Sequence, residues 1–388
     1  MSNTLLINQL IFNDKNNIFD IINIKIKNLY AQEFDVNDDE FDYIFDPGDY
    51  IEDYESPNEP FIDGDLEQEN VDDDIGFIDG DLEQENVDDD IGFIDGDLEQ
   101  ENVDTGNKSL GELDFSFAAV GDWACKSEAE DTTENIIEQN PDFVIALGDL
   151  SYNGKAKCWL EIIEPIAEKT KIVIGNHETD SSKLLDTYMD VFNLENEYYS
   201  FNYGNVHFLV LSTETKFKEN SPQYEFAVQD LEKYSNDPTI NFIISFFHRQ
   251  IYSSSSSLDD EEDFREVYHP LFDKYGVDLG LSGHLHVYER SFPINYNDDD
   301  DDEPIITDQN PDFYKNNDGT IFVTVGTGGA HEMQLSKSKP YSAIGIEDEF
   351  GILNVDIRNN GTELIGTFID NGKKKEVLDK FRIIKDIT

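Results

Sequence analysis

The sequence contains few cysteines, few basic residues and no long apolar run, and each scarcity excludes a class of protein. Two cysteines in 388 residues are too few for a small scaffold held together by disulfides. The 27 lysine and arginine residues face 86 aspartate and glutamate residues, which gives a formal net charge of −59. A chain this acidic repels polyanions, so we expect neither nucleic acid nor an anionic membrane surface as a partner.

The absence of long apolar runs excludes a membrane span, because a spanning helix needs about 18 or more consecutive apolar residues. Residues 4–30 are rich in isoleucine, leucine and asparagine, but Asp14, Lys15 and Asp20 interrupt them, so no clear signal peptide is present. The sequence LYAQ at 29–32 resembles a cleavage site. We therefore leave the structure of residues 1–33 and the localisation of the protein undecided at this point.

Residues 34–104 hold 30 of the acidic residues and no lysine or arginine. Within them the 16-residue sequence FIDGDLEQENVDDDIG occupies 61–76, recurs at 77–92 and begins again at 93–104. Each unit offers few apolar positions and its charges repel one another, so we expect residues 34–106 to be a disordered acidic region rather than a solenoid. Weak calcium binding by the clustered aspartates is the alternative, although their spacing does not match an EF-hand loop.

From residue 107 onward, short apolar runs alternate with polar loops and helical segments. Strand, polar loop and helix recur in the order typical of a parallel or mixed β-sheet, in which the chemistry lies at the carboxyl ends of the strands. The acidic run 298–302 is expected to be a solvated loop. Strands are expected at 115–120, 141–147, 171–174, 198–212 (a hairpin), 240–247, 277–281, 321–325 and about 348–383 (antiparallel), and helices at 131–139, 159–168, 222–235 and 264–275.

Polar side chains follow five of the apolar runs directly, where strands are expected to end. Carboxylate oxygen and imidazole nitrogen together suit iron, manganese or zinc. One such loop would be weak evidence, because carboxylates at strand ends are often merely solvated, but five in succession indicate a metal site. The residues are Asp122, Asp149 with Tyr152, Asn176 with His177, His248, and His284 with His286.

The segment Gly283–His286 is the most informative of these loops. Side chains two residues apart on an extended segment share a face, so we expect His284 and His286 to point the same way. Gly283 allows the backbone to turn tightly and to approach a bound group. This geometry suits two imidazoles beside two adjacent metal ions, whereas a surface turn with two histidines is the alternative.

Residues 114–333 resemble the calcineurin-like metallophosphoesterases, and within them the purple acid phosphatase branch. The motifs that carry the resemblance are GDWA at 121–124, GDLSY at 148–152, GNHE at 175–178, FFHR at 246–249 and GHLHVYER at 283–290. The resemblance implies an α/β fold over residues 107–388, with two packed mixed β-sheets flanked by helices. It also implies two metal ions bridged by one carboxylate.

Carried over motif by motif, the resemblance makes Asp149 the bridging residue. Ala124 stands where the wider superfamily usually has a histidine, and Tyr152 replaces that histidine as a phenolate ligand of the kind that stabilises Fe(III). The expected ions are therefore Fe(III) and a divalent Fe, Zn or Mn. The first metal would be held by Asp122, Tyr152 and His286, and the second by Asn176, His248 and His284.

These features predict a binuclear metal-dependent hydrolase of small phosphomonoesters, in which metal-bound hydroxide attacks phosphorus. By the resemblance His177 contacts phosphate, and we expect it to stabilise the transition state or to protonate the leaving oxygen. Orienting Asn176 or Asp149 is its alternative role. A phosphodiesterase or nucleotide pyrophosphatase on the same site is the enzymatic alternative. An acidic metal-buffering or interaction protein on a phosphoesterase scaffold is the non-enzymatic one, and a missing ligand would favour it.

Some features depart from the family or stay undecided. Plant purple acid phosphatases carry further histidines after the motif that contains His248, whereas this chain has SSSSSLDDEED at 253–263. Arg249 could reach the substrate or pair with the nearby acids. Cys125 and Cys158 each follow a motif loop, and they form either a disulfide or two separate buried thiols. The resemblance favours a secreted or extracytoplasmic protein, and it leaves the natural substrate and the oligomeric state open.

Overall fold

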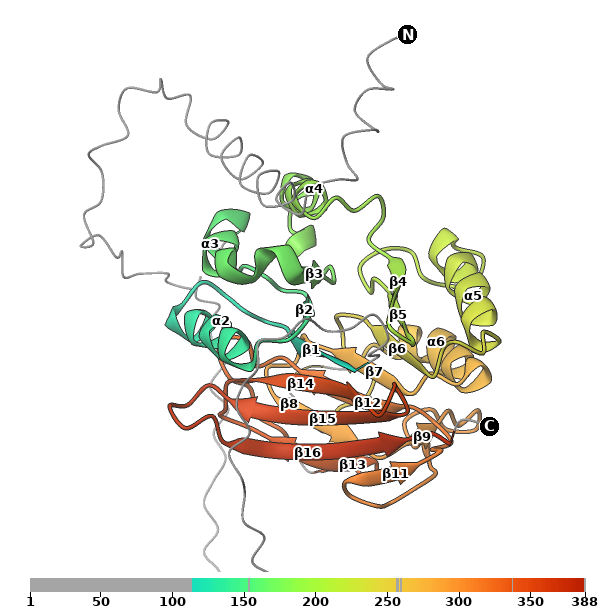
Figure 1. Cartoon of the computed structure of the whole chain (residues 1–388). Helices are drawn as coiled ribbons and strands as arrows, with labels where there is room; N and C mark the ends of the chain where they lie inside the picture. The colour runs from blue at the N-terminus through green and yellow to red at the C-terminus, as the bar shows by residue number, and fades with distance from the viewer. Residues whose placement is uncertain (1–113, 153, 256–257, 259, 337, 387–388) are drawn as a thin grey trace, which may run out of the picture. The chain divides into compact units, whose positions relative to one another are not determined.

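The structure is a computed structural model, and it describes residues 114–386 apart from residues 153, 256–257, 259 and 337 (Figure 1). The segments 1–33 and 34–106, with the acidic repeats, lie outside the described residues, as do residues 107–113. In the described part of the chain, no helix has the length and apolar character needed to cross a membrane.

One seven-stranded mixed sheet joins the first three strands of the described chain to its last three. Its strand order is β11-β16-β15-β14-β1-β2-β3. Strands β1, β2 and β3 run parallel, whereas β14 pairs with β1 in the antiparallel direction and places Val355 opposite Phe117. The strands are β1 (Phe115–Val120), β2 (Phe143–Ala146), β3 (Thr170–Ile172), β11 (Phe313–Lys315), β14 (Gly351–Arg358), β15 (Glu363–Asp370) and β16 (Val377–Ile384).

A second seven-stranded mixed sheet holds the middle of the chain. Its order is β13-β8-β12-β7-β6-β5-β4, and its four central strands β12, β7, β6 and β5 are parallel. A two-stranded ribbon of β9 (Ile294–Asn295) and β10 (Ile305–Ile306) lies outside it. The strands are β4 (Tyr199–Tyr203), β5 (Val206–Val210), β6 (Phe242–Phe246), β7 (Leu279–Ser282), β8 (Tyr288–Ser291), β12 (Ile321–Val325) and β13 (Ser342–Ile346).

The described residues form five α-helices, and local sequence signals mark some of their ends. The side chain of Ser221 accepts a hydrogen bond from the amide of Tyr224, and Pro222 follows it as the first helical residue, which fixes the start of α5. Gly276, with φ 69°, ends α6 in the left-handed conformation. The helices are α2 (Ser127–Gln139), α3 (Ala156–Ile162), α4 (Ser182–Val191), α5 (Pro222–Ser235) and α6 (Glu262–Tyr275), with 3₁₀ turns η1 (Glu164–Lys169) and η2 (His177–Thr179).

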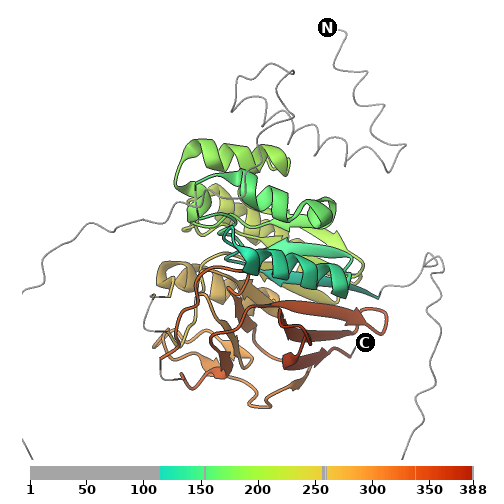
Figure 2. The ribbon, with the colours of Figure 1, turned by 90° about the vertical axis from the view of Figure 1, so that its left-hand side faces the viewer.

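The two sheets pack face to face over an aromatic core. Phe117 and Phe143 of the first sheet meet Phe208 and Phe246 of the second, with ring centroids 5.3 Å apart for Phe143 and Phe208 and 6.0 Å apart for Phe117 and Phe246. A second apolar cluster lies between the other face of the second sheet and helices α5 and α6. Figure 1 shows α2 and α3 on one side and α5 and α6 on the other, and Figure 2 shows α2 lying against the C-terminal strands. The elements therefore form four layers, helix–sheet–sheet–helix.

The predicted fold of two packed mixed sheets flanked by helices is confirmed. The predicted strands 115–120 and 321–325 and the predicted helix 222–235 agree with β1, β12 and α5 residue for residue. Helix α2 begins at Ser127 rather than at residue 131, because Glu128 and Glu130 in its first turn interact favourably with the helix dipole.

The predicted solvated loop at 298–302 is confirmed for most of its residues, which are exposed, but two of its carboxylates also bind a buried side chain. The buried guanidinium of Arg265 donates hydrogen bonds to Asp301 at 2.8 Å and to Asp302 at 2.6 Å. Burying a guanidinium requires paired carboxylates, and this acidic run supplies two of them. The loop is therefore fixed to helix α6.

Candidate metal centre

The predicted site residues lie at the carboxyl ends of the parallel strands, where the edges of both sheets meet. Asp122 follows β1 and Asp149 follows β2 in the first sheet, whereas His248 follows β6 and His284 follows β7 in the second. Hydrogen bonds join the two sheets at this edge, from the amide of Gly121 to the carbonyl of Val325 (2.8 Å) and from the amide of His284 to Asp122 Oδ2 (2.8 Å).

Three candidate ligands have backbone conformations that residues other than glycine rarely adopt. The φ angles of Asp122, Asp149 and His284 are 60°, 51° and 67°. Each such residue costs on the order of 1 kcal/mol or more, and such residues cluster at functional sites. These conformations turn the chain sharply after each strand, so that the side chains of the three residues point across the shared edge of the sheets.

The expectation that His284 and His286 lie on an extended segment is wrong. The amide of Leu285 donates to the carbonyl of Gly283 (2.9 Å), and the amide of Val287 donates to the carbonyl of Leu285 (2.7 Å), so the chain makes two consecutive tight turns. Leu285 is fully buried between the histidines and anchors the loop. The two imidazoles still lie at the same edge of the sheets, but His286 lies beside Tyr152, whereas His284 lies beside Asp149 and His248.

The first group contains Asp122, Tyr152 and His286, with Asp149 beside them. The hydroxyl of Tyr152 donates to Asp122 Oδ1 (2.9 Å), and it lies 2.8 Å from His286 Nε2 and 3.4 Å from Asp149 Oδ2. Burial and the charge of Asp122 raise the pKa of Tyr152 above its usual value. His286 Nδ1 lies 2.5 Å from the carbonyl of His331, so that donation from Nδ1 leaves Nε2 facing the tyrosine.

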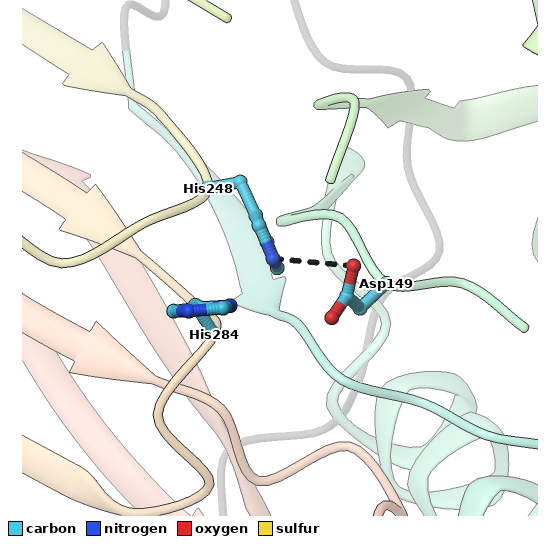
Figure 3. A group of neighbouring side chains, drawn as sticks. All are labelled: Asp149, His248 and His284. Carbon is cyan, nitrogen blue, oxygen red and sulfur yellow. Dashed lines mark ion pairs between the residues drawn. The ribbon is translucent and has the colours of Figure 1, made fainter. Parts of the chain in front are cut away.

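The second group contains Asp149, His248, His284 and Asn176. One ligand atom each of Asp149, His248 and His284 lie within 4.8 Å of one another, and the three side chains converge in Figure 3. His248 Nε2 lies 3.2 Å from Asp149 Oδ1 and 3.2 Å from Asn176 Oδ1, while its Nδ1 donates to the carbonyl of Leu147 (2.8 Å). The imidazole is thereby oriented with Nε2 toward the site.

The electrostatics of this corner favour positive charge. Burial alone would lower the pKa of His248, but the carboxylate of Asp149 raises it to about 10. Burial and the charge on His248 lower the pKa of His284 to about 4, so His284 presents a neutral imidazole. Among the described residues, Asp122 and Asp149 form ion pairs only with histidines, although both carboxylates are buried. Two buried carboxylates, a phenol and imidazoles that give up a proton when a metal ion binds can hold Fe, Zn or Mn ions.

Asp149 is the residue that touches both groups. Its Oδ1 faces His248, and its Oδ2 faces Tyr152. The amide of His177 donates to Oδ1 (3.0 Å), and His248 and His177 together lower the pKa of Asp149 although its burial opposes this. A carboxylate placed in this way can bridge two cations.

His177 stands at the open side of the site, with its side chain about one third exposed. Its ring lies 4.3 Å from the ring of Tyr152, and its Nε2 lies 3.9 Å from Asp149 Oδ2. Its Nδ1 is 3.2 Å from Asp180. The ring therefore lies beside Tyr152 and Asp149, at the edge of the candidate metal centre.

Sequence reasoning missed Glu178, which is fully buried beneath the site. Its carboxylate accepts hydrogen bonds from the backbone amides of Asp149 (2.8 Å), Leu150 (2.8 Å) and Gly175 (2.9 Å). Burial and the charge of Asp149 raise the pKa of Glu178 to about 7. Its place as the last residue of the GNHE motif was the available signal. Glu178 joins the loops that carry Asp149 and Asn176.

The structure places Cys125 and Cys158 together in a disulfide, with Cα atoms 5.9 Å apart. The bond connects the loop that follows β1 to helix α3. It therefore restrains the segments that flank Asp122 and Tyr152, on the side of the first group.

Two family models match most of this fold. The model described as calcineurin-like phosphoesterase matches residues 115–288, and the model described as iron/zinc purple acid phosphatase-like protein C matches residues 319–380. Residues 115–288 therefore form a calcineurin-like phosphoesterase domain. Every candidate metal ligand lies within this domain.

Individual relatives agree with this assignment. The chain is 27% identical to purple acid phosphatase 15 of Arabidopsis thaliana, over 55% of this chain and 45% of that protein. It is 28% identical to a nucleotide pyrophosphatase/phosphodiesterase of Hordeum vulgare, over 66% of this chain and 76% of that protein. The solved purple acid phosphatase PPD1 of yellow lupin (Lupinus luteus) seeds superposes with a TM-score of 0.62 at 26% identity, over 70% of this chain and 54% of that one. This chain thus spans about half the length of the Arabidopsis and lupin proteins.

Proposed function

We propose that the protein is a binuclear metal-dependent phosphatase that hydrolyses small phosphomonoesters. The observation that carries the proposal is the position of Asp149, whose two oxygens face two separate groups of oxygen and nitrogen donors. Asp122, Tyr152 and His286 would hold one ion, and Asn176, His248 and His284 the other. The phenol of Tyr152 favours Fe(III) in the first place, with a divalent Fe, Zn or Mn in the second.

Two cations at these groups would supply positive charge to the phosphoryl oxygens and an activated water as nucleophile. The chain's own residues hold and orient the reacting groups. Asp149 keeps both donor groups on one substrate position, and Glu178 fixes the loop of Asp149. His177, at the open side, is placed to donate a proton to the leaving alcohol oxygen, which is the contribution expected of a general acid.

A phosphodiesterase or nucleotide pyrophosphatase activity is the second candidate. It is favoured by the similarity to the Hordeum protein of that name, because this chain covers 76% of that protein but only 45% of the Arabidopsis one. The donor groups suit either reaction, because both need an activated water and charge neutralisation at phosphorus.

The disulfide supports a secreted or extracytoplasmic location, because structural disulfides persist in oxidising compartments. The purple acid phosphatases among the relatives support the same location by analogy.

The proposal is tested by turnover of a panel of phosphomonoesters and phosphodiesters after loading with iron plus zinc, iron plus manganese, or iron alone. Metal content is measured on the same samples. We expect two metal ions per chain and turnover that requires both. A fully loaded protein that hydrolyses neither class of ester would refute the enzymatic proposal and favour a metal-binding or interaction protein.

A further inference from the structure

Arg249 directly follows His248 in the chain, but it is not one of the candidate metal ligands. Its Nε donates to Glu214 Oε1 at 2.7 Å, and its Nη2 donates to Glu214 Oε2 at 3.2 Å. Its Nη1 lies 3.4 Å from His284 Nε2, at the second donor group. One side of the guanidinium is therefore held by a carboxylate, while the other side reaches the candidate metal centre.

This arrangement differs from a surface ion pair. The side chains of Arg249 and Glu214 are 28% and 10% exposed, respectively. Glu214 is itself fixed, because the hydroxyl of Thr213 donates to its Oε1 (3.0 Å) and its amide donates to Ser212 Oγ (3.1 Å). Glu261 lies farther off, 3.8 Å from Arg249 Nε. A planar guanidinium held in this bidentate manner is pre-organised, so little side-chain freedom remains to be lost when it binds an anion.

The N–H groups of Arg249 that do not bind Glu214 can donate to an anion at the metal centre. A guanidinium carries five N–H donors, and Glu214 engages two of them. Nη1 approaches a nitrogen that, as proposed above, faces a metal ion. Two positive groups so close together repel each other unless an anion lies between them. An oxygen bound at the second donor group would satisfy both.

The number of non-bridging oxygens on phosphorus then determines which class of ester can accept a hydrogen bond from Arg249. A phosphomonoester has three non-bridging oxygens, whereas a phosphodiester has two. If each of two cations takes one non-bridging oxygen, only a monoester keeps a third for Arg249. His177 lies on the side of Tyr152, and Arg249 lies on the side of His284, so the two residues flank the position from different sides.

We propose that Arg249 binds the third non-bridging oxygen of a phosphomonoester and thereby selects monoesters over diesters, with Glu214 as its positioning residue. This inference rests on the proposed function. It gives Arg249 direct contact with the substrate and gives Glu214 an effect only through Arg249.

The decisive measurement is the ratio of kcat/KM for a monoester and a diester with the same leaving alcohol. In Arg249→Met we expect monoester kcat/KM to fall roughly 10–100-fold, the loss of one charge-assisted hydrogen bond, while diester kcat/KM changes less than about 3-fold. Guanidinium ion added to Arg249→Met should restore part of the monoester rate. Glu214→Gln should lower the same ratio by a smaller factor, and Arg249→Lys should lie between Arg249→Met and the wild type.

Lys218→Met is the matched control, because Lys218 forms an exposed ion pair with Asp263 and its loss changes the net charge equally. We expect this variant to keep the wild-type ratio, and we expect all variants to keep wild-type metal content. Equal losses for both esters, or no loss for either, would overturn the role of Arg249 while leaving the phosphatase proposal intact.

Binding separates failure of this inference from failure of the proposed function. Calorimetry with orthophosphate and with dimethyl phosphate needs no turnover. In Arg249→Met only orthophosphate should bind more weakly, again roughly 10–100-fold. A wild-type protein that is loaded with metal but binds neither ligand would refute both proposals, whereas equal weakening for the two ligands would refute this one alone.

Discussion

Replacing Glu178 should destabilise the fold and the metal centre together, because one buried carboxylate serves both. Its Oε2 accepts from the amides of Asp149 and Gly175, and its Oε1 accepts from the amide of Leu150. Glu178→Ala removes all three acceptors and leaves three buried N–H groups without a partner in a site that side chains enclose.

The magnitude follows from these contacts. A buried donor without its acceptor costs about 1–3 kcal/mol, so the loss of acceptors for three amides should lower the free energy of unfolding of Glu178→Ala by roughly 3–9 kcal/mol. Glu178→Gln keeps one oxygen, which can still accept from Asp149 and Gly175, but turns its NH₂ group toward the amide of Leu150. It also removes the repulsion by Asp149 that helps to raise the pKa of Glu178 to about 7. We expect the Gln variant to lose only roughly 1–2 kcal/mol.

Urea unfolding in the presence of a chelator measures these differences without a contribution from metal binding. Trp123 and Trp159, the two tryptophans of the chain, are both buried and report unfolding by fluorescence. Glu138→Ala, at an exposed position of α2, is the matched control and should behave like the wild type. A wild-type free energy of unfolding in Glu178→Ala would refute the reasoning, as would a Gln variant less stable than the Ala variant.

Four further predictions address the site, the pH dependence and the N-terminal segment. Tyr152→Phe should abolish the visible phenolate-to-iron absorption of the oxidised, iron-loaded protein, and an active iron-loaded wild type without any such band would show that Tyr152 is no ligand. Asp149→Asn should lose both metals and all activity, whereas His177→Ala should keep both metals but turn over about 10²–10⁴-fold more slowly, as for lost acid–base assistance; the reverse pattern of metal loss would contradict the assignment. Burial raises the pKa of Asp260 to about 7, so the folded state holds a proton that the unfolded state has lost between about pH 4 and 7, and stability should fall as pH rises through this window, by roughly 2–4 kcal/mol; Asp260→Asn should flatten the decline in urea unfolding, and an unchanged slope would count against it. Deleting residues 1–106 should leave metal content and turnover intact, because all candidate ligands lie between residues 122 and 286, and a folded deletion variant without metal would place part of the site in that segment.

The sequence was sufficient to predict the elements that local patterns encode. Apolar runs followed by polar loops predicted β1 and β12, and the predicted helix 222–235 coincides with α5, which the structure shows to be capped by Ser221. Polar residues directly after apolar runs predicted which loops meet, because the carboxyl ends of parallel strands share an edge. The assignment of the second sheet came from the resemblance, since periodicity does not state which strands pair.

Other features could not be read from local patterns, because contacts distant in sequence determine them. The bend at His284 depends on burial of Leu285 and on the hydrogen bond to Asp122, which is 162 residues away in the chain. Glu178 acts through three backbone amides, and the sequence does not reveal which amides lack another acceptor. Arg249 could be assigned to solvent or to the site only after Glu214 was located, 35 residues earlier in the chain.

The hydrogen bond between Asp122 and the amide of His284, which joins the two sheets, affects the order in which the fold assembles. Loop-closure entropy makes contacts between distant segments form late, and this one joins the first strand of the described fold to a loop that follows the seventh. The donor groups can therefore reach their final positions only after both halves have docked. Metal uptake during refolding should then occur later than the formation of helices. A bound ion would contact residues of both halves and would slow their separation during unfolding.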